Sequence, residues 1–177
     1  MQKLIVLNIV LWNVIFAGTT SWAQSISTNK VAEKTDWAVF IDKDPTECWV
    51  VAQPKQTVNK LNGRVVAAKR GEILLFVFYR PGEKLTGQVA FTGGYPFSKS
   101  APLSFDIDGK KYFLPTIDDQ WAWAASSADD SKIISAMKLG ARAKITGKST
   151  RGKTTIDTFS LKGFTAAIND AKKRCGG

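Results

Sequence analysis

Two neighbouring carboxylates beside two tryptophans come nearest to a set of residues that could do chemistry. Asp118 and Asp119 precede Trp121 and Trp123. Cleavage of a glycosidic bond needs two carboxyl groups at a defined separation, which adjacent residues on one loop rarely reach. The pair of tryptophans therefore favours binding of a carbohydrate or small ligand over its cleavage. The competing interpretation is a solvated turn followed by tryptophans of the core.

Other catalytic and metal-binding sets lack members in this sequence. The 177 residues contain no histidine, which removes the Ser-His-Asp and Cys-His nucleophile pairs and the common zinc sites. Asp106 and Asp108 before Gly109 are similar to the start of a calcium loop, but the later ligands are missing and a hairpin explains the pattern. We therefore predict a protein that is not an enzyme and uses no metal or cofactor. An enzyme that uses carboxylates alone is the minor alternative.

Positive charge is concentrated near the C-terminal end of the chain. The formal net charge is +10, yet residues 24–130 contain 13 basic and 13 acidic residues, whereas residues 131–177 contain 11 basic residues and 2 acidic ones. Such asymmetry is typical of a surface that meets an anionic partner, although a basic face can also serve solubility alone. The cations that we expect to contact such a partner are Arg142, Lys144, Lys148, Arg151 and Lys153.

The first 23 residues predict a cleaved signal peptide. A positive start is followed by an apolar run over 4–17, and Ser21 and Ala23 supply the small residues of a cleavage site before Gln24. The run is shorter than the ~20 residues that span a bilayer. We expect a periplasmic or secreted protein whose partner is an anionic envelope component, an acidic glycan or an acidic protein. Peripheral contact with a membrane would be one form of this binding, and nucleic acid is not expected.

Cys48 and Cys175 are the two cysteines of the chain. Because thiols oxidise outside the cytoplasm, an intramolecular disulfide between them is the simplest interpretation. An intermolecular bridge or two free thiols remain the alternatives.

The spacing of apolar residues predicts one β-rich domain over 36–177, preceded by a disordered leader over 24–35. Alternating or continuous apolar runs predict strands, and residues 72–79 are the candidate central strand because both of their faces are apolar. Helical spacing appears twice, over 130–139 with Asp130 as a possible cap, and again from Phe164. The fold class is therefore mainly β, an antiparallel β-sandwich-like single domain with two short α-helices. The other predicted strands cover 36–42, 47–53, 87–92, 103–107, 112–114, 141–148 and 154–161.

Asp157 is predicted to share a strand face with Phe159 and Leu161 and so to be partly buried. A buried carboxylate needs a cation or several donors. Arg151, across the preceding turn, is the expected partner in a structural ion pair.

Motifs spread over residues 36–175 carry a resemblance to a known family. They lie at 37, 48–49, 75–77, 80–81, 94–97, 122–124, 136–140, 149–152 and 157–167. The chain resembles the invasion-associated locus B family of exported proteins from Gram-negative bacteria, most specifically in its last block. That resemblance implies a β-sandwich-like fold and an envelope or secreted protein, and for founding members an association with entry into host cells. It implies no catalytic activity and no cofactor.

Overall fold

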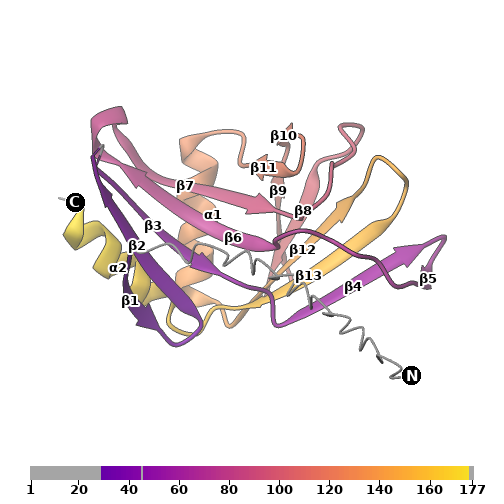
Figure 1. Cartoon of the computed structure of the whole chain (residues 1–177), viewed down its shortest axis with the longest axis horizontal. Coiled ribbons are helices and arrows are strands. Elements are labelled where there is room, and N and C mark those ends of the chain that lie inside the picture. Colours follow the sequence, from indigo (N-terminus) through magenta and orange to yellow (C-terminus); the bar gives the residue numbers. More distant parts are fainter. Residues whose placement is uncertain (1–28, 45, 176–177) are drawn as a thin grey trace, which may run out of the picture.

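The computed structural model describes residues 29–44 and 46–175 of the chain. The predicted signal peptide and residues 24–28 of the predicted leader lie outside these residues. The described chain folds into two antiparallel β-sheets with two α-helices (Figure 1). The predicted fold class is confirmed.

Sheet A has seven strands and sheet B has six. In spatial order, sheet A contains β1 (Lys30–Lys34), β2 (Trp37–Lys43), β3 (Thr46–Ala52), β6 (Leu74–Arg80), β7 (Leu85–Thr92), β11 (Trp121–Trp123) and β10 (Thr116–Asp118). Sheet B contains β5 (Arg64–Val65), β4 (Gln56–Leu61), β13 (Thr154–Ser160), β12 (Arg142–Lys148), β8 (Leu103–Ile107) and β9 (Lys110–Leu114). A single 3₁₀ turn, η1 (Pro81–Glu83), links β6 to β7.

The core lies between the sheets and under the helices. Every second residue of the long strands points inward, as the buried and exposed positions of β12 and β13 show. Phe91 of sheet A meets Phe159 of sheet B edge to face, with ring centroids 6.1 Å apart. We call the sides of the sheets that contact this core their inner faces and the opposite sides their outer faces.

The two helices complete the inner side of sheet A. Helix α2 (Phe164–Arg174) packs against β1, β2 and β3, where Phe164 contacts Trp37 at a centroid distance of 4.8 Å. Helix α1 (Ser127–Leu139) packs against β7. In Figure 1, β1 and α2 lie at the left-hand end of the molecule, and β4 and β5 lie at the right-hand end.

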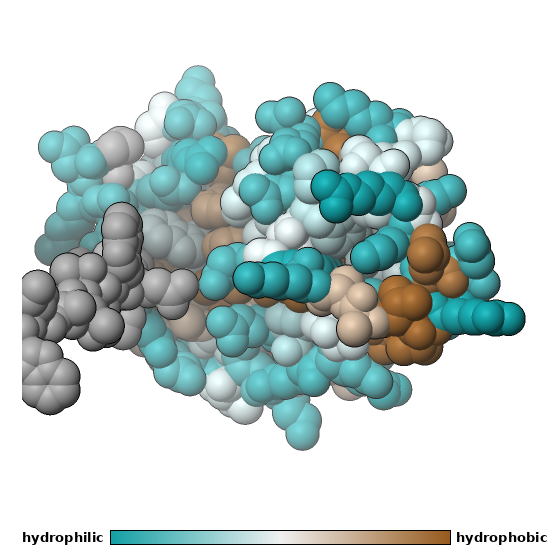
Figure 2. Space-filling model, turned by 45° about the vertical axis from the view of Figure 1, so that its right-hand side comes forward, coloured by the Kyte–Doolittle hydropathy of each residue, from teal (hydrophilic) through white to brown (hydrophobic). Residues whose placement is uncertain are grey.

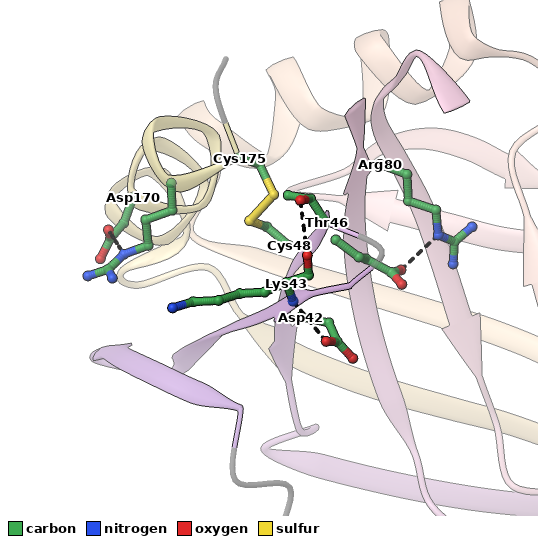
Figure 3. Close-up of a disulfide and its surroundings, with 9 residues drawn as sticks. Asp42, Lys43, Thr46, Cys48, Arg80, Asp170 and Cys175 are labelled. Carbon is green, nitrogen blue, oxygen red and sulfur yellow. Dashed lines mark hydrogen bonds and ion pairs between the residues drawn. A yellow bond between two sulfur atoms is a disulfide. The ribbon is translucent and has the colours of Figure 1, made fainter. Parts of the chain in front are cut away.

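The predicted disulfide is confirmed. Cys48 of β3 is bonded to Cys175 at the end of α2, with the two Cα atoms 6.0 Å apart (Figure 3). The bond joins residues 127 positions apart in the sequence. It fixes the C-terminal helix to the inner face of sheet A.

Three sequence-based expectations about the elements need correction. Residues 30–34 belong to the predicted leader but form β1. Pairing with β2 supplies their backbone hydrogen bonds, and this pairing cannot be predicted from the polar residues of the segment itself. Helix α1 is capped by Ser126 and not by Asp130, whose carboxylate accepts a hydrogen bond from the Val89 amide at 2.8 Å. Strand β6 is central in sheet A, as predicted, but no second layer of the described chain covers its outer face.

Candidate anion-binding face

The cations predicted on one side of residues 141–148 do lie on one side of β12. Arg142, Lys144 and Lys148 are exposed, whereas the alternate residues Ala143 and Ile145 are buried in the core. This arrangement follows from the two-residue repeat of a strand. The three cations therefore stand on the outer face of sheet B.

Two further cations join this face from strands that are distant in sequence. Lys148 pairs with Thr154, which in turn pairs with Lys60 of β4. On the other side of β12, Lys144 pairs with Asp106, which pairs with Lys111 of β9. Residues directly opposite one another on paired strands share a face. Sequence reasoning missed Lys60 and Lys111 because only the strand order of the sheet brings them beside β12.

The five cations of this face have no acidic partner within the described residues. We call Lys60, Lys111, Arg142, Lys144 and Lys148 the outer cations. In the ranges 29–44 and 46–175, no carboxylate oxygen lies within 4.0 Å of their charged nitrogens. Asp106 shares the face, but its carboxylate accepts a hydrogen bond from the Gly109 amide of its own turn. The face therefore carries an excess of positive charge.

The predicted ion pair between Arg151 and Asp157 is wrong. The partner of Asp157 is Arg70, whose two terminal nitrogens donate hydrogen bonds to the two carboxylate oxygens at 2.7 Å each. Asp157 is fully buried and the Arg70 side chain is 6% exposed. Asp157 points inward from β13, while Arg151 lies at the exposed turn beyond the end of that strand. The chain that precedes β6 brings Arg70 to the carboxylate from inside the sandwich.

The Arg70 side chain is held by several further contacts. Its Nε donates to the Gly93 carbonyl oxygen at 2.8 Å, and its guanidinium lies 5.0 Å from the centre of the Tyr95 ring. The Tyr95 hydroxyl is 2.6 Å from Thr155 Oγ1, and burial raises the pKa of Tyr95 to about 12, so the hydroxyl is neutral at physiological pH. Burial also raises the pKa of Asp157, and the guanidinium opposes that rise. This cluster is a buried structural unit.

Arg151 and Lys153 stand apart from the outer cations. Both residues belong to the turn between β12 and β13 and line a cavity of about 280 Å³ together with Lys69. No Asp or Glu is among the described residues that line this cavity, and Arg70, which also lines it, is paired with Asp157. The five predicted cations are thus divided between a sheet face and a cavity at one end of sheet B.

Trp121 and Trp123 lie on the outer face of sheet A, away from the outer cations. Their rings are near parallel, with centroids 6.2 Å apart, and Trp121 also contacts Phe76 at 5.6 Å. Asp118 and Asp119 are exposed beside them. Phe76 also lines a groove of about 950 Å³ along β1, β2, β3 and β6. The tryptophans are half-buried, which agrees with neither a fully buried core nor a freely exposed platform.

Neither a metal cluster nor a membrane-spanning helix occurs in the described ranges. No three His, Cys, Asp or Glu side chains there gather closely enough to hold a metal ion. No helix of the same residues is long and apolar enough to cross a membrane.

Comparison with known proteins finds one matching family model and one similar solved structure. Residues 33–172 match the family model described as Invasion associated locus B (IalB) protein. The chain belongs to the invasion-associated locus B family. Among solved structures, it is similar to the crystal structure of invasion associated protein b from Bartonella henselae, with a TM-score of 0.54 and 15% identity. That match covers 82% of this chain and 98% of the other, and it supports the fold alone.

No curated protein matches the chain. The family is one of exported proteins, and the disulfide between Cys48 and Cys175 fits that setting, because disulfides persist where thiols are not kept reduced. Membership therefore accounts for the β-rich fold and for the resemblance seen in the sequence.

Proposed function

We propose that this invasion-associated locus B protein is a non-enzymatic periplasmic or secreted protein that binds an anionic partner through the outer face of sheet B. Host-cell interaction and envelope maintenance are both consistent with such binding. The observation that carries the proposal is the group of five outer cations, which share one face and have no carboxylate partner in the described chain.

The absence of partners in the described chain argues for an external ligand. Cations placed on one face repel one another and contribute little to folding unless an acid lies near them. On this face Asp106, in register with Lys144 and Lys111, stands against five cations. Elsewhere in the described chain, acids do stand beside cations: Lys55 contacts Asp36 at 2.6 Å and Arg80 contacts Glu47 at 2.8 Å. An anionic partner would supply the missing charges. Its binding would weaken steeply as salt is added, because exposed charges are screened.

Arg151 and Lys153 give this proposal a second contact region. With Lys69 they surround the 280 Å³ cavity at the end of sheet B. A phosphate, sulfate or carboxylate group of the partner would fit the charge of this cavity. We expect it to add to binding by the outer face.

Charge reversal tests the proposal. The triple variant Arg142→Glu, Lys144→Glu and Lys148→Glu is expected to lose at least about a hundredfold in affinity, because each cation near an anionic surface contributes on the order of 1 kcal/mol and the new carboxylates repel the partner. Binding to anionic lipid vesicles, lipopolysaccharide and heparin would be measured across a salt series. The proposal fails if all three probes bind the variant as tightly as the wild type.

A matched control separates the face from net charge. Lys43, Lys138 and Lys173 lie on β2, α1 and α2, outside the strands of sheet B. Their reversal to Glu changes the net charge by the same amount. This control triple is expected to keep most of the binding, and equal losses in the two triples would show that the position of the cations is irrelevant.

A second candidate function is binding of a carbohydrate or small ligand by the outer face of sheet A. The contact of Trp121 with Phe76, and of Phe76 with the 950 Å³ groove, favours it because these rings form one continuous aromatic surface. Binding of an uncharged sugar would quench tryptophan fluorescence and would not respond to salt. A panel of neutral oligosaccharides without any fluorescence change would exclude it.

A further inference from the structure

The outer cations of sheet B lie beside apolar side chains in a regular pattern. The strand registers place five residues of five neighbouring strands in one row across the outer face: Val58, Ile156, Thr146, Ser104 and Phe113. We call this the central row. It has no charged member, and Phe113, at its β9 end, is 54% exposed.

Cations stand on both sides of the central row. One neighbouring row contains Lys148 and Lys60 and ends at Val65 of β5, which is 72% exposed. The other contains Lys144 and Lys111, with Asp106 in register between them. Neighbouring strands are about 4.8 Å apart, so six strands span about 24 Å from β5 to β9. Exposed apolar side chains therefore mark the two edges of the face, and cations lie between them.

No element of the described chain covers this face. Helices α1 and α2 pack against strands of sheet A, and the exposed alternate residues of β12 show that solvent reaches the outer side. The side of the molecule shown in Figure 2 is mostly hydrophilic, with its most prominent hydrophobic patch near the right-hand edge and smaller ones left of the centre and near the top. Sheet B thus presents charge with local apolar surface, which a purely solvating face does not require.

We propose that the outer face of sheet B docks on an anionic lipid surface, with the outer cations at the headgroup phosphates and Phe113 and Val65 entering the boundary with the acyl chains. This inference rests on the proposed function and names its partner. A lipid surface supplies a partner for both kinds of side chain. Its headgroups carry negative charge for the cations, and the acyl chains just beneath them are apolar. A soluble polyanion supplies charge alone and leaves Phe113 and Val65 in water.

The decisive experiment compares one lipid probe with one soluble probe. The full mature protein is sedimented with vesicles of equimolar phosphatidylglycerol and phosphatidylcholine, and its binding to heparin is measured in the same buffer. The variants are Phe113→Ser, Val65→Ser and their combination. Because both side chains are largely exposed, the thermal unfolding midpoint is expected to stay within about 2 °C of the wild type.

Each apolar substitution is expected to weaken vesicle binding about fivefold, which corresponds to burial of roughly half a side chain. Heparin binding is expected to be unchanged. The matched control is Leu139→Ser, because Leu139 is 92% exposed at the end of α1, outside the strands of sheet B. Leu139 lines a pocket with Lys110 and Tyr112, which alternate along β9 with Phe113 and so lie on the side opposite the outer face. The control removes an apolar side chain whose size lies between those of Val65 and Phe113, and it is expected to leave vesicle binding unchanged.

Three outcomes overturn the inference. Wild-type binding to heparin without binding to the vesicles would do so, and the anionic partner would then be a soluble polymer. Equal vesicle binding by the wild type and by the Phe113→Ser, Val65→Ser double variant would also do so. Equal losses for Leu139→Ser would show a general loss of hydrophobicity. None of these three outcomes contradicts the proposed function. The proposed function fails separately if substitution of Arg142, Lys144 and Lys148 by Glu changes binding to neither probe.

Discussion

The outer faces of the two sheets differ in where their side chains find partners. On sheet A, Phe40 stacks on Trp49 at a centroid distance of 5.3 Å, and Arg80 is paired with Glu47. On sheet B, the outer cations have no carboxylate partner in the described chain. The side chains of the first face stabilise the fold by packing against one another. Those of the second face contribute little to folding and are free to meet another molecule.

The largest effect is expected from the bond that holds α2 against sheet A. Replacing Cys48 and Cys175 by Ala should lower the free energy of unfolding by up to about 5 kcal/mol, because the bond closes a long loop in the unfolded chain. Urea denaturation of the variant and the wild type measures this loss. The folded variant should bind heparin as the wild type does, and a parallel loss of binding would show that the two sheets are not independent.

Next in size is the contrast between a buried cation and an outer one. Arg70→Ala leaves the Asp157 carboxylate buried without its partner and should cost about 3–5 kcal/mol of stability. Lys144→Ala removes a cation with no partner and should change stability by no more than about 0.5 kcal/mol. For binding to an anionic probe, we expect Lys144→Ala to cause the greater change. Similar unfolding midpoints for the two variants would contradict the idea that the buried cation serves stability and the outer cation serves binding.

A third comparison uses one ring from each outer face. Trp49→Ala removes a half-buried ring stacked on Phe40 and should destabilise the protein by about 2 kcal/mol. Phe113→Ala removes a ring that is more than half exposed and should cost less than about 1 kcal/mol. Chemical denaturation of both variants gives the difference. A larger loss at Phe113 would mean that this ring serves folding more than docking.

The smallest effect concerns a carboxylate on the inner side of sheet A. Burial raises the pKa of Asp130, the nearby Asp129 adds to the rise, and the hydrogen bond from the Val89 amide opposes it. Folded protein therefore binds a proton more readily than unfolded protein, so this group favours folding below its unfolded pKa and loses that contribution as pH rises through its folded pKa.

Asp130→Asn tests this direction. The Asn side-chain oxygen can accept the Val89 hydrogen bond without titrating. The variant should equal or exceed the wild type in stability at pH 7, and the gap should narrow as the pH falls towards 4. Urea midpoints at several pH values give the comparison, and a gap that widens on acidification would contradict the prediction.

Local patterns in the sequence were enough to predict most of the elements. The Asp108-Gly109 turn between β8 and β9 and the helix from Phe164 lie where residue spacing places them, because turn chemistry and periodicity are properties of neighbouring residues. The same reasoning correctly placed Arg142, Lys144 and Lys148 on one side of a strand. Strand β1 was missed because its stability comes from pairing with β2 and not from its own polar residues.

The parts of the candidate site that sequence reasoning missed depend on contacts between distant residues. Arg70 and Asp157 are 87 positions apart, so no local spacing distinguishes Arg70 from the nearer Arg151. Lys60 and Lys111 belong to the outer face only because β4 and β9 flank the strands around β12 in sheet B. Their order depends on the whole topology of the sandwich.

The bond between Cys48 and Cys175 also decides how the molecule bears mechanical load. All of sheet B, from β4 to β13, lies within the covalent loop that this bond closes. Tension applied between the two ends of the described chain passes directly from Cys48 to Cys175 and bypasses that loop. Strands β1 and β2 can peel away under such a pull, but the face that carries the outer cations stays unloaded. A tether at either end would therefore leave the geometry of the outer cations unchanged.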